Sequence, residues 1–109
     1  MDKRPHFSAL NIIHRVISEH ICEGDVCIDA TAGRGGDTLF LARLVGESGH
    51  VTAFDIQQDA VDSTRRLLEE NGMSHRADVL LKSHSEMDEL FAEESVSLIT
   101  FNFGWLPGG

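Results

Sequence analysis

The sequence has few basic residues, no long apolar run and no cysteines spaced to bind a metal. It contains 9 Lys and Arg against 18 Asp and Glu, a formal net charge of -9. Such a chain does not form an extended basic clamp for nucleic acid, although it can touch RNA locally. No apolar stretch approaches the roughly 18 residues that span a bilayer. The polar N-terminus has no apolar signal-peptide core, so we expect a cytoplasmic protein that does not enter a membrane.

The cysteines and histidines indicate no metal site. Cys22 and Cys27 are five residues apart, which is neither a metal-ligand spacing nor a disulfide framework. We expect two buried or half-buried thiols in a reducing compartment. Five of the histidines have no ligand spacing, and we interpret them as surface or boundary residues: His6, His14, His20, His50 and His75.

The length and the hydrophobic pattern predict one small α/β domain over residues 1–109. The apolar fraction of 41% and the charged fraction of 25% are typical of a soluble globular protein. Helices are expected at 7–22, 38–45, 58–71 and 86–91, and the second would be capped by Asp37. Strands are expected at 26–28, 50–54, 78–82 and 96–101. This alternation predicts a doubly wound parallel sheet of the Rossmann-like kind.

Notable polar residues follow each predicted strand. They are Asp29, Asp55, Ser83 with His84, and Asn102. In doubly wound sheets the ligand binds outside the carboxyl ends of the strands. The sequence therefore places a ligand site at this edge.

The segment 29–36, Asp-Ala-Thr-Ala-Gly-Arg-Gly-Gly, follows the first strand directly. Its glycines allow positive φ and close approach of a ligand, and the next helix offers free N–H groups. Such a loop suits many nucleotides, and the glycines could also serve only a tight turn. Asp55, 20 residues after Gly35, can accept the hydroxyls of an adenosine ribose, or it could merely cap the helix that follows.

Two residues favour a cationic adenosine ligand over a dinucleotide. The dinucleotide fingerprint needs a third small residue where Thr38 stands. A carboxylate at Asp29 would repel a pyrophosphate, whereas S-adenosylmethionine carries a sulfonium and an ammonium. Asp29 could bind that ammonium, directly or through water, or it could orient the N–H groups of the loop. A P-loop is excluded because no Gly-Lys-Ser/Thr follows the glycines.

Three segments together resemble a family of small class I methyltransferases formerly labelled as rRNA methylases, some of which act on the wobble uridine of tRNA. They are Asp-Ala-Thr-Ala-Gly-Arg-Gly-Gly-Asp-Thr-Leu-Phe-Leu-Ala at 29–42, Ala-Phe-Asp-Ile-Gln at 53–57 and Phe-Asn-Phe-Gly-Trp-Leu-Pro-Gly-Gly at 101–109. The likeness runs nearly from end to end, and the last segment is the specific one. The family commonly has Asn at position 34, Leu at 103 and Tyr at 105.

The resemblance implies S-adenosyl-L-methionine as cofactor and RNA, with tRNA foremost, as substrate. The residues expected to bind the cofactor are Asp29, Thr31, Gly33, Gly35, Asp37, Thr38, Asp55, Ile56, Gln57, Ser83 and His84. Asn102 would be catalytic, because its carbonyl would hold the target amine in line with the transferring methyl. Trp105 would stack on the target base, or it could be one more core aromatic. His84 would contact adenine, or it could be a solvated loop residue. The alternatives are a non-catalytic nucleotide-binding fragment and a nicotinamide-dependent oxidoreductase.

A complete class I methyltransferase usually has seven strands, and only four are visible here. Because the sequence stops inside the last family segment, we expect a protein truncated after the fourth strand. Its edge strand would then be unpaired, and dimerisation or poor solubility would follow.

Overall fold

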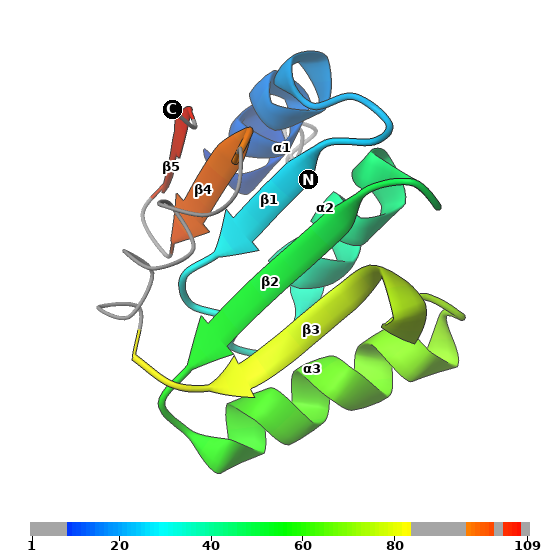
Figure 1. Ribbon diagram of the computed structural model, residues 1–109. Helices are drawn as coiled ribbons and strands as arrows, with labels where there is room; N and C mark the ends of the chain where they lie inside the picture. Colours follow the sequence, from blue (N-terminus) through cyan, green and yellow to red (C-terminus); the bar gives the residue numbers. More distant parts are fainter. Residues whose placement is uncertain (1–8, 84–95, 102–103, 108–109) are drawn as a thin grey trace, which may run out of the picture.

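The computed structural model describes residues 9–83, 96–101 and 104–107. Five strands form one sheet in the order β3-β2-β1-β4-β5 (Figure 1). The first four are parallel, and they are β1 (Val26–Asp29), β2 (His50–Asp55), β3 (Ala77–Leu81) and β4 (Leu98–Phe101). The α/β class and the parallel sheet predicted from the sequence are confirmed.

Strand β5 (Gly104–Pro107) is an antiparallel neighbour of β4, and the sequence did not predict it. Its register pairs Phe101 with Gly104 and Leu98 with Pro107. Gly104 and Pro107 are unfavourable in strands, so no strand signal is visible in the sequence here. Proline is tolerated in β5 because the strand lies at the edge of the sheet. The expectation that β4 would have an unpaired edge was therefore wrong.

Three α-helices contribute to the main core. They are α1 (Ala9–His20), α2 (Gly36–Val45) and α3 (Gln58–Glu70). Their buried residues pack with strand residues such as Cys27, Val51 and Leu98 in one cluster. A second, smaller cluster contains Ile28 and Phe54, which alternate with the first set along the strands. Helix 86–91 of the prediction lies outside the described residues.

The apolar face expected for helix α1 is confirmed in part among the described side chains. Ile17 and Ile21 are buried, but Val16, expected on the same face, is 38% exposed, and Ile12 is 52% exposed. In α3 the expected face is confirmed, because Val61, Thr64 and Leu68 are all buried. Of the two free thiols, Cys27 is buried, and burial raises its pKa to about 12, whereas Cys22 is exposed rather than half-buried.

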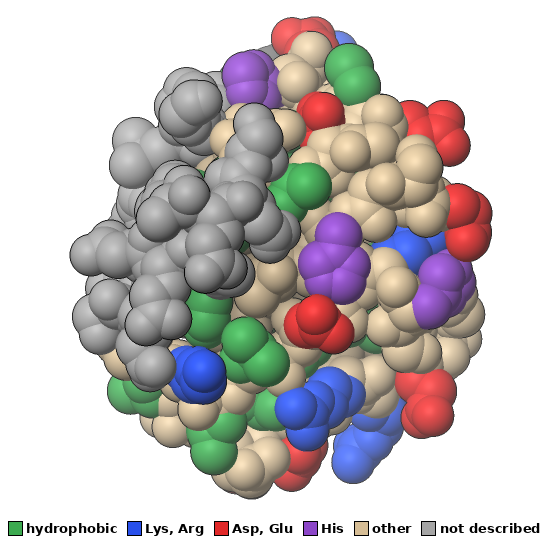
Figure 2. Space-filling view, in the orientation of Figure 1, with side chains coloured by type: hydrophobic (Ala, Val, Ile, Leu, Met, Phe, Trp, Pro, Cys, Tyr) green, Lys and Arg blue, Asp and Glu red, His purple; other side chains and the backbone are tan. Residues whose placement is uncertain are grey.

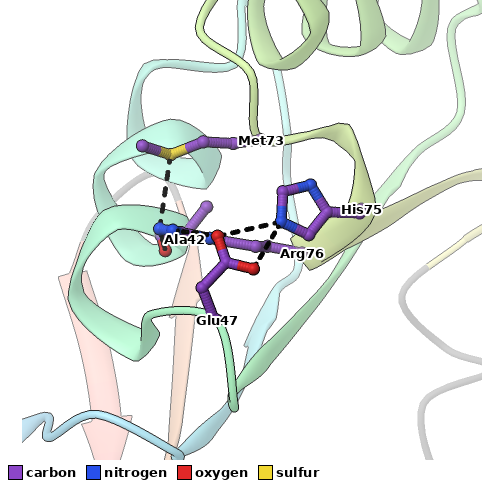
Figure 3. Close-up of polar contacts among 5 residues, drawn as sticks. All are labelled: Ala42, Glu47, Met73, His75 and Arg76. Carbon is purple, nitrogen blue, oxygen red and sulfur yellow. Dashed lines mark hydrogen bonds and ion pairs between the residues drawn. The ribbon is translucent and has the colours of Figure 1, made fainter.

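A polar cluster at the amino end of the sheet fastens the short 3-10 helix η2 (Ser74–Arg76) to the end of α2 (Figure 3). Arg76 donates from Nη1 to the Ala42 carbonyl at 3.2 Å and from Nη2 to Glu47 at 2.6 Å. His75 contacts the same carboxylate at 2.9 and 3.1 Å. The hydrogen bonds from Arg76 and His75 lower the pKa of Glu47. The cluster lies opposite the carboxyl ends of the strands, and its contacts join η2 to the end of α2.

One carbonyl on the outer edge of β3 is occupied by a side chain of α3. Arg65 donates from Nη2 to the carbonyl of Val79 at 2.7 Å. Figure 2 shows Lys and Arg side chains gathered over this part of the molecule, with acidic side chains around them.

Candidate functional site

The glycine loop is tied to both neighbouring strands. Ala30 donates its N–H to the carbonyl of Thr100 in β4 at 2.7 Å, and Ala32 donates to that of Phe54 in β2 at 2.8 Å. A third bond, from Gly35 to Ala32 at 2.9 Å, closes the loop upon itself. The loop therefore has a fixed shape at the carboxyl ends of β1, β2 and β4.

Asp29 lies beneath this loop and is fully buried. One carboxylate oxygen accepts from the N–H of Thr31 at 3.2 Å, and the other accepts from the hydroxyl of Thr38 at 2.6 Å. Burial raises the pKa of Asp29 to about 7; the hydrogen bonds from Thr38 and Thr31 oppose that rise, and the charge of Asp37 adds to it. Of the two roles left open by the sequence, this geometry fits the organiser of the loop. It also explains why position 38 is a threonine rather than a glycine.

Asp55 is the half-buried carboxylate at the end of β2. Its Oδ2 accepts from the N–H of Gly33 at 3.0 Å, and its Oδ1 accepts from the N–H of Gln57 at 2.9 Å. Gln57 is itself the N-cap of α3, so Asp55 does not bond to the first turn of that helix. The carboxylate instead joins the glycine loop to the turn before α3. A carboxylate has about four lone-pair sites, so about two remain for a ligand.

A hollow of about 190 Å³ opens between the ends of β1, β2 and β3, and its lining consists of Ala30, Thr31, Asp55, Ile56, Lys82 and Ser83. Four of these were predicted from the sequence, whereas Ala30 and Lys82 were missed, although Ala30 lies in the glycine loop and Lys82 ends a predicted strand. Ile56 is 74% exposed, an unusual position for a large apolar side chain. The hollow is smaller than the 300–1,000 Å³ typical of ligand pockets, so it fits one part of a ligand.

Helix α3 supports the loop from behind. Gly35 has φ +94°, and a Cβ atom there would lie 2.9 Å from the Cα of Thr64. The hydroxyl of Thr64 donates to the carbonyl of Gly33 at 3.2 Å. Gly33 has φ +57°, but an added Cβ would meet nothing within 4 Å. The loop is thus closely packed at Gly35 and open at Gly33, as a cradle for a ligand requires.

Asp37 does not cap α2, contrary to the sequence prediction. The N-cap is Gly35, whose backbone is in the left-handed conformation, and the helix begins at Gly36, two residues before the predicted start. Asp37 therefore lies in the first turn. Its Oδ1 contacts Nε2 of His14 in α1 at 2.9 Å. The His14 ring also stacks on Phe40, with centroids 3.9 Å apart and planes 10° apart. Sequence reasoning also missed His14, which lies beside the site. The available signal was its position three and seven residues before the buried Ile17 and Ile21.

Three predicted site residues cannot be placed with their side chains. His84 and Asn102 lie outside the described residues. The backbone of Trp105 lies in β5, where it pairs with Thr100. Their assignments therefore remain predictions.

Other features of the described part of the chain do not compete with this site. A larger hollow of about 580 Å³ lies between α3 and β3, but it contains none of the predicted site residues, and its two arginines face three acidic residues. Among the described residues, no group of three or more His, Cys, Asp or Glu could hold a metal ion. No described helix has the length and hydropathy needed to cross a membrane.

A parallel sheet with a glycine loop after β1 and an acidic residue at the end of β2 is typical of Rossmann-like nucleotide-binding proteins, and the class I methyltransferases are among them. Solved structures agree. A "putative rRNA-methylase" from Clostridium thermocellum superposes with a TM-score of 0.83 at 39% identity, covering 94% of this chain and 54% of that one. A "putative methyltransferase" from Streptococcus mutans in complex with SAH superposes with a TM-score of 0.76 at 32% identity, covering 98% of this chain and 56% of that one.

The family is shown by the sequence comparison. Residues 51–109 match the family described as "Putative rRNA methylase", and the chain belongs to it. It is also 41% identical over 110 residues to the chloroplastic tRNA (mnm(5)s(2)U34)-methyltransferase of Arabidopsis thaliana, covering 93% of this chain and 40% of that protein. The chain thus spans about half the length, or less, of these relatives.

Proposed function

We propose that this chain forms the methyl-donor site of an S-adenosylmethionine-dependent methyltransferase that acts on RNA, with the aminomethyl group of a tRNA wobble uridine as its target. The observation that carries the proposal is Asp55, a half-buried carboxylate fixed by two backbone N–H groups on the wall of the hollow. The relative from Arabidopsis is named for this tRNA position, and the one from Streptococcus mutans holds SAH.

The residues of the hollow fit an adenosine. The remaining lone pairs of Asp55 would accept hydrogen bonds from both ribose hydroxyls. The exposed side chain of Ile56 would cover one face of the base, and Thr31 and Ser83 line the same hollow. His84, the next residue along the chain, would accept a bond from the adenine amino group, as the sequence suggests. Gln57 takes part through its backbone, which fixes Asp55.

The glycine loop and the start of α2 then receive the amino-acid end of the donor. Gly33 leaves open space above the loop. Asp29 and Thr38 lie beneath it and keep its shape, so neither needs to touch the ligand. Asp37, whose side chain is 42% exposed, is the carboxylate available to the ammonium group. This division of roles gives Asp29 and Thr38 a supporting role in place of the contact with the cofactor that the sequence predicted, and it moves the cation contact from Asp29 to Asp37.

The reaction is a direct displacement, for which the donor supplies a methyl group on a positively charged sulfur. The protein's task is alignment, which can lower the barrier by several kcal/mol (about 7–11 in the best cases). Asn102 would accept a hydrogen bond from the target amine and hold its lone pair toward the methyl group. Because the amine attacks in its neutral form, the demand for a base is modest. Trp105 would stack on the uridine ring.

Titration calorimetry with S-adenosylhomocysteine and with NAD tests the donor site. We expect S-adenosylhomocysteine to bind and NAD not to bind. The reverse result would refute the proposal and favour an oxidoreductase. Transfer of labelled methyl groups to undermodified bulk tRNA then tests the reaction. Binding without transfer would identify a non-catalytic nucleotide-binding protein.

Two substitutions separate binding from chemistry. Asp55→Ala should abolish binding of S-adenosylhomocysteine, because the ribose hydroxyls lose their acceptor and the loop loses its anchor. Asn102→Ala should leave that binding unchanged and remove methyl transfer. Full transfer by Asn102→Ala would show that the catalytic assignment is wrong.

The same proposal places the protein in the cytoplasm, a reducing compartment that keeps Cys22 and Cys27 as thiols.

A further inference from the structure

The contact between α1 and the first turn of α2 is more elaborate than helix packing requires. His14 makes two specific interactions at once, a hydrogen bond to Asp37 at 2.9 Å and a stack on Phe40 with ring centroids 3.9 Å apart. Because an ionised carboxylate only accepts hydrogen bonds, Nε2 of His14 carries the hydrogen. The stack on Phe40 therefore fixes the plane of the imidazole, and the hydrogen bond to Asp37 fixes its rotation within that plane.

This arrangement fixes one oxygen of Asp37 and leaves the other available. The bond to His14 uses Oδ1, and no bond of Oδ2 is found among the described residues. The side chain of Asp37 is 42% exposed and that of His14 is 27% exposed, so the pair lies at the surface beside the loop. The charge of Asp37 also reaches into the loop, where it contributes to the raised pKa of Asp29.

We propose that His14 is a positioning residue for the methyl donor, which holds Asp37 so that its free oxygen receives the donor's ammonium group. This inference rests on the function proposed above. A free aspartate side chain has several rotamers, and a carboxylate fixed in one of them binds a cation without that loss of freedom. The stack on Phe40 restrains the His14 ring in turn. Phe40 of α2 therefore restrains His14 of α1, and His14 restrains Asp37 of α2.

A second His–Asp pair in the chain provides a matched control. His50 and Asp78 contact each other at 3.1 Å, and their side chains are 37% and 69% exposed. His50 begins β2, so this pair lies at the end of the sheet opposite the glycine loop. The two pairs share their chemistry and differ in location.

The test compares His14→Phe with His50→Phe and uses two ligands. S-adenosylhomocysteine has the amino-acid end, whereas 5'-methylthioadenosine has the same nucleoside without it. His14→Phe keeps an aromatic ring for Phe40 but removes the donor to Asp37. We expect it to weaken S-adenosylhomocysteine about tenfold, the size of one modest charge-assisted contact, and to leave methylthioadenosine unchanged. His50→Phe should change neither dissociation constant.

Two further variants sharpen the result. His14→Gln retains an N–H donor and should restore most of the affinity. In an Asp37→Asn background, His14→Phe should have no further effect, because both substitutions break the same contact. Thermal unfolding followed by circular dichroism confirms that each variant is folded.

The outcomes separate this inference from the proposed function. If the unsubstituted protein binds neither ligand, the donor site itself is refuted. If it binds both and His14→Phe binds them equally well, only the positioning role is refuted. Equal weakening of both ligands would also refute it, because a general disturbance of the fold does not distinguish the two ends of the donor.

Discussion

Replacing Asp29 by Asn should flatten the dependence of stability on pH. Asp29 is fully buried, and burial raises its pKa from 3.8 to about 7. Because the folded protein holds this proton more tightly than the unfolded chain does, the carboxyl contributes most to stability below pH 3.8. That contribution is lost as the pH rises toward 7. A rise of about three pKa units corresponds to about 4 kcal/mol over the whole window.

An amide can take the place of this carboxyl group. In Asp29→Asn the carbonyl oxygen can accept from the N–H of Thr31, and the NH2 group can donate to the hydroxyl of Thr38. The variant should therefore be no less stable than the natural protein at pH 8. The difference between the two unfolding free energies should change by about 2 kcal/mol between pH 5.5 and pH 8, because the rest of the window lies at lower pH.

Urea unfolding followed by circular dichroism measures this difference at several pH values. The range above pH 5.5 also avoids precipitation near the isoelectric point of about 4.9. Asp59→Asn serves as the control, because Asp59 is exposed in the first turn of α3. Parallel stability curves for Asp29→Asn and the natural protein would refute the assignment of a raised pKa to Asp29. A loss of several kcal/mol at every pH would show that the charge itself holds the loop.

Two other substitutions test the packing. Gly35→Ala should destabilise the protein by about 2 kcal/mol or more, because positive φ is strained for alanine and its Cβ would meet the backbone of Thr64 at 2.9 Å. Gly33→Ala has the strain without the contact and should cost about 1 kcal/mol, so equal losses would contradict the close approach at Gly35. Arg76→Ala should cost about 2 kcal/mol in urea unfolding, since Ala42 loses its donor, and an unchanged midpoint would show that the cluster contributes nothing.

The parallel strands could be predicted from sequence because their signals are local. Val26-Cys27-Ile28 is apolar on both faces, and His50 to Phe54 is bounded by a glycine turn and an acidic residue. The structure places these strands within one or two residues of the prediction. The residues of the hollow were also largely predictable, because the carboxyl ends of parallel strands meet at one edge.

What sequence reasoning missed depends on contacts between distant residues. Strand β5 is held by its pairing with β4, which overrides the poor strand propensity of Gly104 and Pro107. His14 acquires its role from Asp37 and Phe40, 23 and 26 positions along the chain, and no spacing within α1 announces either partner. Val16 has helical periodicity with the buried Ile17 and Ile21, yet its side chain is 38% exposed.

The bond from Arg65 to Val79 bears on how the sheet can grow between molecules. A strand from another chain that added to β3 would need the outward carbonyls of that strand, and Arg65 already occupies the one at Val79 with a charge-assisted bond of 2.7 Å. A strand of another molecule that pairs with β3 must first displace the Arg65 side chain from the Val79 carbonyl. The positive charge of Arg65 would then lie beside the added strand. Arg65→Ala would leave the Val79 carbonyl without this donor. The tendency of the variant to form fibrils or strand-swapped dimers, compared with that of the natural protein, would measure how well one side chain protects an edge strand.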